Sequence, residues 1–147
     1  MMAQAYEIGP IEDEQVDSAY LLARLAVPTL ELDGWRDRCR QSPGREADDI
    51  LVASNPRGYV QGLAISAVTL ERLGALVLDI SSFVVVSAAD GPGVGVELFD
   101  HLALRAKRAG CASIRVHLLD RSERQLSVDA TRQEIDALLR AASRAVS

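Results

Sequence analysis

The stretch Asp90-Gly91-Pro92-Gly93-Val94-Gly95 combines residue types that could bind an anion. A strand-like apolar run, Phe83–Val86, precedes it, and an amphipathic stretch that predicts a helix follows. The first turn of a helix presents about four backbone N–H groups without partners inside the helix, at the positive end of the helix dipole. Glycines lack a Cβ, so a bulky anion can approach this backbone closely. The stretch therefore predicts an anion site, for which a diphosphate is the natural ligand.

The spacing of the glycines excludes two common phosphate-binding loops. A P-loop ends in Gly-Lys-Ser/Thr, and this stretch has no such ending. The dinucleotide fingerprint needs a third glycine three residues after the second. Counted from Gly91 and Gly93, that position is Val96. Counted from Gly93 and Gly95, it is Leu98. A plain glycine turn between a strand and a helix remains the alternative.

Hydrophobic periodicity and chain-breaking residues predict the elements that position this stretch. The expected elements are a strand at Tyr6–Ile8, a helix at Asp13–Val27 capped by Asp13, a short helix carrying Leu32, Trp35 and Cys39, strands at Ile50–Ala53, Tyr59–Leu70 and Ala75–Val86, a helix at Gly93–Ala109 stopped by Gly110, a strand at Ser113–Leu118 and a helix at Thr131–Ala145. This order predicts a layered α/β domain.

Three segments add detail to this prediction. The runs on either side of Glu71–Gly74 form an expected hairpin, and neither alternates cleanly, so helices are expected on both faces of the sheet. Asp120–Asp129 is polar and is expected to be a loop. Thr131 and Glu134 have the spacing of a capping box at the start of the last helix.

The glycine stretch resembles the pyrophosphate loop of the GCN5-related N-acetyltransferase (GNAT) superfamily, whose usual form is Gln/Arg-x-x-Gly-x-Gly/Ala. The preceding strand, with Phe83 and Val85 as an apolar-x-Val pair, is similar to that family too. The resemblance covers about residues 5–118 and implies a single GNAT-like domain over residues 1–147. It implies an α/β (α+β layered) fold with a mixed, mostly antiparallel central sheet and helices on both faces. Residues 119–147 are atypical.

The resemblance implies acetyl-CoA, or coenzyme A, as the cofactor. In the family, the strand edge at about Val84–Val86 pairs by backbone with the pantetheine arm. The N–H groups from about Gly91 to Gly95 hold the pyrophosphate. The implied cofactor-binding residues are Phe83, Val84, Val85, Val86, Asp90, Gly91, Pro92, Gly93, Val94 and Gly95.

The sequence departs from the family pattern in two places. The family's Gln/Arg is Asp90 here, and a carboxylate repels a diphosphate unless it points away; Asp90 could instead cap the helix. The family often carries a tyrosine as general acid after the strand that here ends at Leu118, and this sequence has no tyrosine beyond that residue. The last two strands of the family could be missing as well.

Transfer to an amine by direct attack on the thioester needs a proton acceptor. Asp79 lies in an apolar run, and histone-type members of the family carry a basic Glu at the like position, so the resemblance implies Asp79 as the base. His117 could replace the missing acid. Alternatively, Asp79 is a carboxylate at a strand bulge, bonded to backbone or to Ser81, and His117 is a half-exposed strand residue.

Five residues could line the acceptor site. Ser81 and Ser82 lie on the same expected strand as Asp79. Glu31, Asp33 and Trp35 fall where the family's acceptor-side helix usually sits and could meet a cationic substrate. The structural alternatives are serines that only satisfy backbone groups, and a capped helix with Trp35 in the core.

The composition limits the classes of partner and the location that can be expected for this protein. The formal net charge is −5, and no Lys/Arg stripe is present, so nucleic acid is not an expected partner. Cys39 and Cys111 match neither a disulfide framework nor a zinc spacing, and no metal site is predicted. No apolar run reaches the roughly 18 residues of a membrane span, and Met1–Pro10 does not resemble a signal peptide. A cytoplasmic protein is expected.

These observations predict an acetyl-CoA-dependent N-acetyltransferase acting on a small amine or a protein amino group. The alternative is a catalytically degenerate GNAT-like domain that serves as a CoA-binding or protein-interaction module. The glycine triplet favours the first reading, whereas Asp90 and the missing tyrosine favour the second. A homodimer is expected if the edge of Ser113–Leu118 is open, although the apolar face of Ile135–Ala142 could cover that edge.

Overall fold

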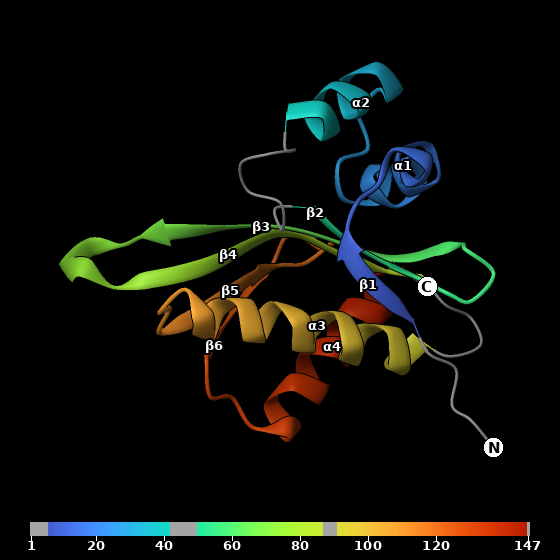
Figure 1. The fold of residues 1–147 in the computed structure, drawn as a ribbon. Helices are drawn as coiled ribbons and strands as arrows, with labels where there is room; N and C mark the ends of the chain where they lie inside the picture. Colours follow the sequence, from blue (N-terminus) through green and yellow to red (C-terminus); the bar gives the residue numbers. More distant parts are fainter. Residues whose placement is uncertain (1–5, 42–49, 87–90, 147) are drawn as a thin grey trace.

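A computed structural model describes residues 6–41, 50–86 and 91–146 of the chain (Figure 1). Its strands and helices are β1 Glu7–Pro10, α1 Val16–Ala26, α2 Leu32–Gln41, β2 Ile50–Ser54, β3 Val60–Leu70, β4 Leu76–Val85, α3 Gly91–Arg108, β5 Ser113–His117, β6 Glu123–Ser127 and α4 Arg132–Val146. A short 3-10 turn at Asp13–Gln15 precedes α1, and a second one at Arg72–Gly74 closes the β3–β4 hairpin.

The strands form one mixed sheet whose spatial order follows the chain, β1-β2-β3-β4-β5-β6. β4 and β5 are parallel, because α3 carries the chain back between them. The other four described pairs are antiparallel. The predicted mixed, mostly antiparallel sheet is therefore confirmed.

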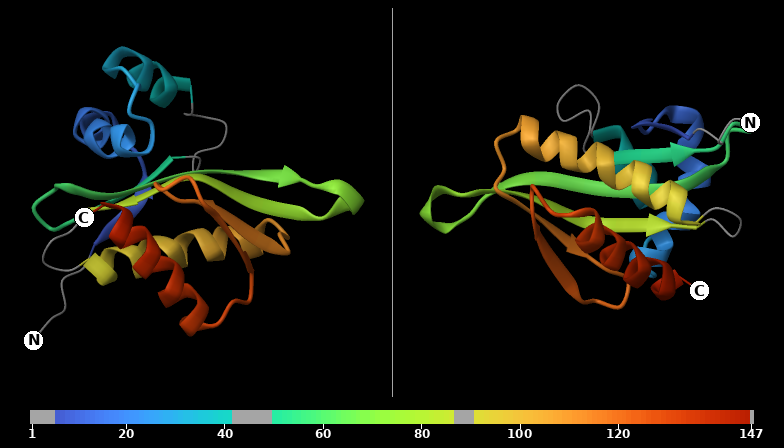
Figure 2. Two further views of the ribbon diagram at one scale, coloured as in Figure 1. Left: turned by 180° about the vertical axis from the view of Figure 1, so that it is seen from behind. Right: turned by 90° about the horizontal axis from the view of Figure 1, so that it is seen from below.

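Helices cover both faces of this sheet, as the apolar character of β3 and β4 predicts. In Figure 1, α1 and α2 lie above the sheet and α3 and α4 lie below it, and the views in Figure 2 agree. Side chains of β4 alternate between the two layers: Phe83 and Val85 join the core under α3 and α4, and Val84 joins the core under α1 and α2. None of the helices in the described ranges has the length and apolar character needed to cross a membrane.

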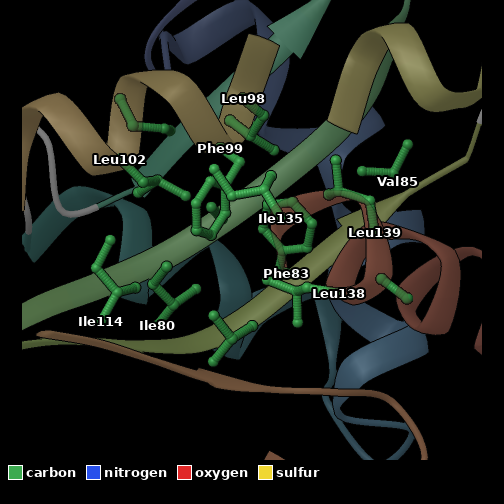
Figure 3. Packing of buried hydrophobic residues seen from close by; sticks show 14 of the residues in the cluster. Ile80, Phe83, Val85, Leu98, Phe99, Leu102, Ile114, Ile135, Leu138 and Leu139 are labelled. Atoms are coloured by element: carbon green, nitrogen blue, oxygen red, sulfur yellow. The ribbon is translucent and has the colours of Figure 1, made fainter. Parts of the chain in front are cut away.

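The larger core lies between the sheet and the α3–α4 layer (Figure 3). The rings of Phe83 and Phe99 meet edge to face there, with centroids 6.3 Å apart. Among the α4 side chains whose burial the structure describes, Ile135, Leu138, Leu139 and Ala142 are buried. Burying one large aliphatic side chain contributes roughly 1.5–3 kcal/mol relative to exposure, so α4 is a major part of this core.

The helix ends follow local chemistry. Gly110 adopts a φ of +82° just after α3, in the left-handed region that favours glycine. At the start of α4, the Thr131 N–H donates to Glu134 Oε1 at 2.9 Å and the Glu134 N–H donates to Thr131 Oγ1 at 3.2 Å, which confirms the capping box. The expected cap at Asp13 is wrong, because Glu12 occupies the N-cap of the turn that leads into α1.

The chain after β5 differs from the prediction of a loop. Asp120–Asp129 contains β6, which pairs antiparallel with β5 from His117↔Glu123 to Ser113↔Ser127. β6 carries no alternating apolar pattern, because its one apolar residue, Leu126, packs against the core while its other residues are exposed. β6 covers the edge of β5, so the expectation that this edge is open is wrong.

Candidate active site

The predicted anion site lies at the first turn of α3. This helix starts at Gly91, two residues earlier than the sequence predicts, while Asp90 lies outside the described residues. Because Pro92 has no N–H, the backbone donors of this turn are those of Gly91, Gly93 and Val94. They lie at the positive end of an 18-residue helix, which is the arrangement that binds phosphate groups.

Gly95 has a packing role that sequence reasoning missed. A Cβ on Gly95 would lie 3.1 Å from Leu139 Cδ2 of α4 and 3.8 Å from Val85 Cγ2 of β4. Figure 3 shows Val85 beside Leu139. Three elements therefore converge at Gly95. Its neighbour Val94 is fully buried, so these two predicted cofactor-binding residues can offer a ligand their backbone only.

β4 and β5 separate halfway along β4. Their parallel ladder runs from Val77↔Ser113 to Ile80↔Val116 and then stops, whereas β4 continues to Val85. In the described part of the chain, no other strand pairs with this side of β4 beyond Ile80. We call this place the β4–β5 divergence.

Phe83 and Val85 present backbone groups toward the divergence. The Val86 N–H donates to the Gln61 carbonyl across β3 at 2.9 Å. Backbone groups alternate in direction along a strand, so Val84 also faces β3. The backbone N–H and C=O groups of Phe83 and Val85 therefore point to the side of β4 on which β5 no longer pairs. Two amide units at this spacing can bind an extended ligand that carries its own amides, so the structure singles out two of the four predicted strand residues.

A β-bulge at Ser81 marks the start of the divergence. The β3–β4 register shifts from Ile65↔Ser82 to Ser66↔Ile80, which leaves Ser81 unpaired. A bulge bends its strand, so it accounts for the departure of β4 from β5. Ser81 is exposed and its hydroxyl donates to the Ile65 carbonyl at 3.3 Å, whereas Ser82 is buried. Of the two predicted acceptor-site serines, only Ser81 lies at the surface.

Asp79 and His117 lie together at the divergence. His117 Nε2 is 3.0 Å from Asp79 Oδ1, and Arg115 Nη1 donates to the same oxygen at 3.3 Å. Arg115 also contacts Glu71 at 2.7 Å and Glu123 at 3.6 Å. We call these five residues the polar cluster. Sequence reasoning singled out Asp79 and His117 separately, and it missed Arg115. The three residues come together only through the pairing register of β4 with β5, which the sequence does not reveal.

The polar cluster is electrostatically asymmetric. Its three carboxylates and one guanidinium leave two negative charges in excess while His117 is neutral. The hydrogen bond from Arg115 to Glu71 is the main reason that the pKa of Arg115 lies above its ordinary value, and the bond to Asp79 adds to this. Asp79 bonds Arg115 and His117, and within the described residues it bonds neither the backbone nor Ser81, as the sequence alternative proposed.

The polar cluster and the glycine turn lie on opposite faces of the sheet. Ile114 and Val116 of β5 belong to the core under α3 and α4, so Arg115 and His117 face the side of α1 and α2. The same alternation applies to Asp79 on β4. The first turn of α3 lies on the other side (Figure 1). The β4–β5 divergence, where the two strands cease to pair, lies between the polar cluster and the glycine turn.

The acceptor-side residues predicted on and before α2 do not gather at the polar cluster. Trp35 is 1% exposed, and its indole N–H donates to the Val16 carbonyl at 2.7 Å. It belongs to the core between the sheet and the α1–α2 layer, as the structural alternative holds. Glu31 and Asp33 are exposed, and Asp33 lies 3.7 Å from Arg36. No contact in the described part of the chain joins either carboxylate to the polar cluster.

A surface hollow lies elsewhere, between β1 and α3. Its lining includes Pro10, Leu51, His101, Leu104 and Arg108, and it contains neither the glycine turn nor the polar cluster. Its lining residues bring no acid–base pair together.

Solved structures with a similar fold carry the names of acetyltransferases. Aminoglycoside antibiotic 6′-N-acetyltransferase from Acinetobacter baumannii has a TM-score of 0.65 and 17% identity, covering 93% of this chain and 88% of its own. Glucosamine-6-phosphate N-acetyltransferase from Arabidopsis thaliana has a TM-score of 0.61 and 17% identity, covering 76% and 81%. Naa50 from Arabidopsis thaliana, in complex with the bisubstrate analogue CoA-Ac-MVNAL, has a TM-score of 0.55 and 16% identity, covering 77% and 72%.

The likeness to these structures is one of fold. No family model matches the sequence, and no curated protein matches it significantly.

Proposed function

On the premise that the chain has the fold of the GNAT superfamily, we propose that it transfers an acetyl group from acetyl-CoA to an amine. The observation that carries this proposal is the β4–β5 divergence. It has an anion-binding helix turn on one face and the Asp79–His117 contact on the other. An elongated donor with a phosphate group at one end and a reactive group at the other suits this arrangement.

The donor would be held mainly by backbone. The N–H groups of Gly91, Gly93 and Val94 would bind the pyrophosphate, and the amide units of Phe83 and Val85 would pair with the pantetheine arm. These donors and acceptors fit the ligand, because a diphosphate needs N–H donors and pantetheine carries amides of its own. When bound, the thioester supplies the acetyl group.

The polar cluster would supply the acid–base groups. An alkylammonium must lose a proton before its nitrogen can attack a carbonyl. Asp79 and His117 contact each other at the divergence, and they are the base and the acid that the sequence predicts. Ser81, exposed at the bulge, would lie beside the acceptor.

The acceptor would be a small amine or a protein amino group. The similar structures include enzymes named for glucosamine 6-phosphate and for an aminoglycoside, and one bound to a peptide-derived analogue. The excess negative charge of the polar cluster and the net charge of −5 favour a cationic acceptor.

A second candidate function is a catalytically degenerate domain that binds CoA or a protein partner. The absence of any tyrosine after Leu118 supports it, as does the carboxylate of Asp90 in the glycine stretch. Acetyl-CoA binding without acetyl transfer to any amine would favour this candidate.

The test begins with titration calorimetry of acetyl-CoA into the purified protein, with Gly93→Glu as the control. A carboxylate in this turn would repel the pyrophosphate, and circular dichroism would check that the control is folded. We expect micromolar binding that the control abolishes. The amine panel follows, with release of free CoA thiol as the signal, using glucosamine 6-phosphate, an aminoglycoside with a 6′-amine and a peptide with a free N-terminus. Absence of binding at millimolar acetyl-CoA would refute the proposal.

A cytoplasmic location and a homodimer complete the proposed function. β6 is an edge strand whose outer side pairs with no strand in the described part of the chain, and such an edge can pair with a second copy. Size-exclusion chromatography with light scattering would decide, and a monomer at all concentrations would rule the dimer out.

A further inference from the structure

We infer that His117 alone takes the proton from the incoming amine and returns a proton to the departing sulfur, and that Asp79 and Arg115 are its positioning residues. This inference rests on the proposed acetyl transfer. It reverses the expectation from sequence, in which Asp79 is the base.

The contacts of Asp79 suit a positioning residue. Its Oδ1 accepts from Arg115 at 3.3 Å and lies 3.0 Å from His117 Nε2. The hydrogen bond from Arg115 therefore already occupies part of the accepting capacity of the Asp79 carboxylate. The Asp79 side chain is also 23% exposed, against 41% for His117. His117 is therefore the more accessible of the two groups to an amine.

The contact with Asp79 selects the tautomer of His117. An ionised carboxylate can only accept, so Nε2 must carry the proton and donate it to Oδ1. Nδ1 of the neutral ring then holds a lone pair. No group in the described part of the chain bonds Nδ1, so this nitrogen can meet a substrate.

Carboxylates predominate among the charged groups around His117. Asp79 of β4 contacts it, and Glu123 of β6 is its cross-strand partner. Arg115 lies two residues earlier on β5, and Glu71 and Glu123 both contact that guanidinium. Three carboxylates and one guanidinium thus lie near the ring, so a positive charge formed on it during the reaction has opposite charges in excess nearby.

The proton steps balance with one histidine. Nδ1 takes one proton from the ammonium, and the neutral amine attacks the thioester carbonyl. The N–C bond forms, the C–S bond breaks, and the second ammonium proton leaves for solvent. The imidazolium then protonates the sulfur, which departs as the CoA thiol. The sum is ammonium plus thioester going to amide, thiol and one proton, with His117 returned to its starting state.

This scheme needs no separate acid. The sequence contains no tyrosine after Leu118, and a histidine that serves both steps makes such a residue unnecessary.

Kinetics of full-length variants test the assignment with the panel amine that gives the highest rate. We expect His117→Gln to lower kcat by about 10²–10⁴-fold while acetyl-CoA binding by calorimetry stays unchanged. The matched control is His101→Gln, which replaces the chain's other histidine, on α3 and exposed. Added imidazole should restore activity to His117→Ala and should not restore activity to Asp79→Ala.

Asp79→Asn separates a positioning residue from a base. Arg115 donates to Oδ1, so it should keep the amide oxygen of Asn toward Nε2 and preserve the tautomer. We expect a loss of only about tenfold, as for one perturbed positioning contact. A loss as large as that of His117→Gln would make Asp79 the base and overturn the inference, as would a His117→Gln rate near wild type.

The tautomer has a readout that does not require activity. Long-range ¹H–¹⁵N NMR of the two-histidine protein, assigned with His101→Gln, should show His117 protonated at Nε2 and unprotonated at Nδ1. The opposite tautomer would overturn the inference. Failure of the proposed function is distinct, because wild type itself would then show no acetyl-CoA binding.

Discussion

Leu139 of α4 occupies the space that a side chain on Gly95 of α3 would need, since a Cβ there would lie 3.1 Å from Leu139 Cδ2. The helix turn proposed to bind pyrophosphate is therefore buttressed by the last helix. Its geometry depends on residues that lie far along the chain from it.

Leu139→Ala should lower the free energy of unfolding by about 2–5 kcal/mol, because it leaves a cavity in a buried site. Gly95→Ala alone should crowd Leu139. In the double variant the shortened side chain on α4 makes room for the new Cβ, so the cost should be smaller than the sum of the two single costs. Urea denaturation of the four proteins measures the coupling. Additive costs would show that α4 does not pack on Gly95 in solution.

β6 can be tested with two proline substitutions at neighbouring exposed positions. The Leu118 N–H donates to the Ser122 carbonyl, and the Val128 N–H donates to the Ala112 carbonyl. Because backbone N–H groups alternate in direction along a strand, the Arg124 N–H points toward β5 and the Gln125 N–H points toward solvent. Arg124→Pro should cost about 3 kcal/mol and Gln125→Pro below about 1 kcal/mol. Thermal or urea unfolding gives both values. Equal costs would argue against the β5–β6 ladder.

Trp35→Phe should destabilise the protein by about 1–3 kcal/mol, because it removes the indole donor to the Val16 carbonyl from the core. The same variant should leave the acceptor KM unchanged, since the ring is buried. A raised acceptor KM at unchanged stability would instead restore the sequence hypothesis that Trp35 meets the substrate.

Stability should fall in alkaline solution through Cys39. Burial raises the pKa of its thiol from 9.0 to about 11, so the unfolded chain loses this proton first as pH rises. The contribution is complete below pH 9 and is lost as pH rises through about 11, a change of about 3 kcal/mol. Urea unfolding should show the advantage of wild type over Cys39→Ala shrinking across that window. A constant advantage would contradict the burial of this thiol.

Helices and strands with a regular spacing of apolar residues could be predicted, because that spacing indicates which face of the element is buried. Leu98 and Leu102 recur along α3 at helical spacing and both are fully buried, and Gly110 marks the end of the helix. The apolar runs of β3 and β4 also predicted helices on both faces of the sheet, and the structure has them.

β6 and the polar cluster lay beyond such reasoning for separate reasons. β6 is an edge strand with one inward residue, Leu126, so it lacks a periodic signal. The contact of Asp79 with His117 depends on the parallel register that sets Asp79 opposite Arg115, and no local pattern encodes a register between segments 36 residues apart. The bulge at Ser81 likewise arises from pairing with β3.

The larger core also has a consequence for synthesis in the cell. It unites Tyr6 with Leu138 and Leu139, so it cannot close until the segment that carries these two leucines has left the ribosome. Until α4 emerges, Phe83 and its apolar neighbours stay uncovered on the nascent chain, a state prone to aggregation. Productive folding should therefore wait until α4 has emerged, and chaperones that shield apolar segments should raise the yield of the native protein.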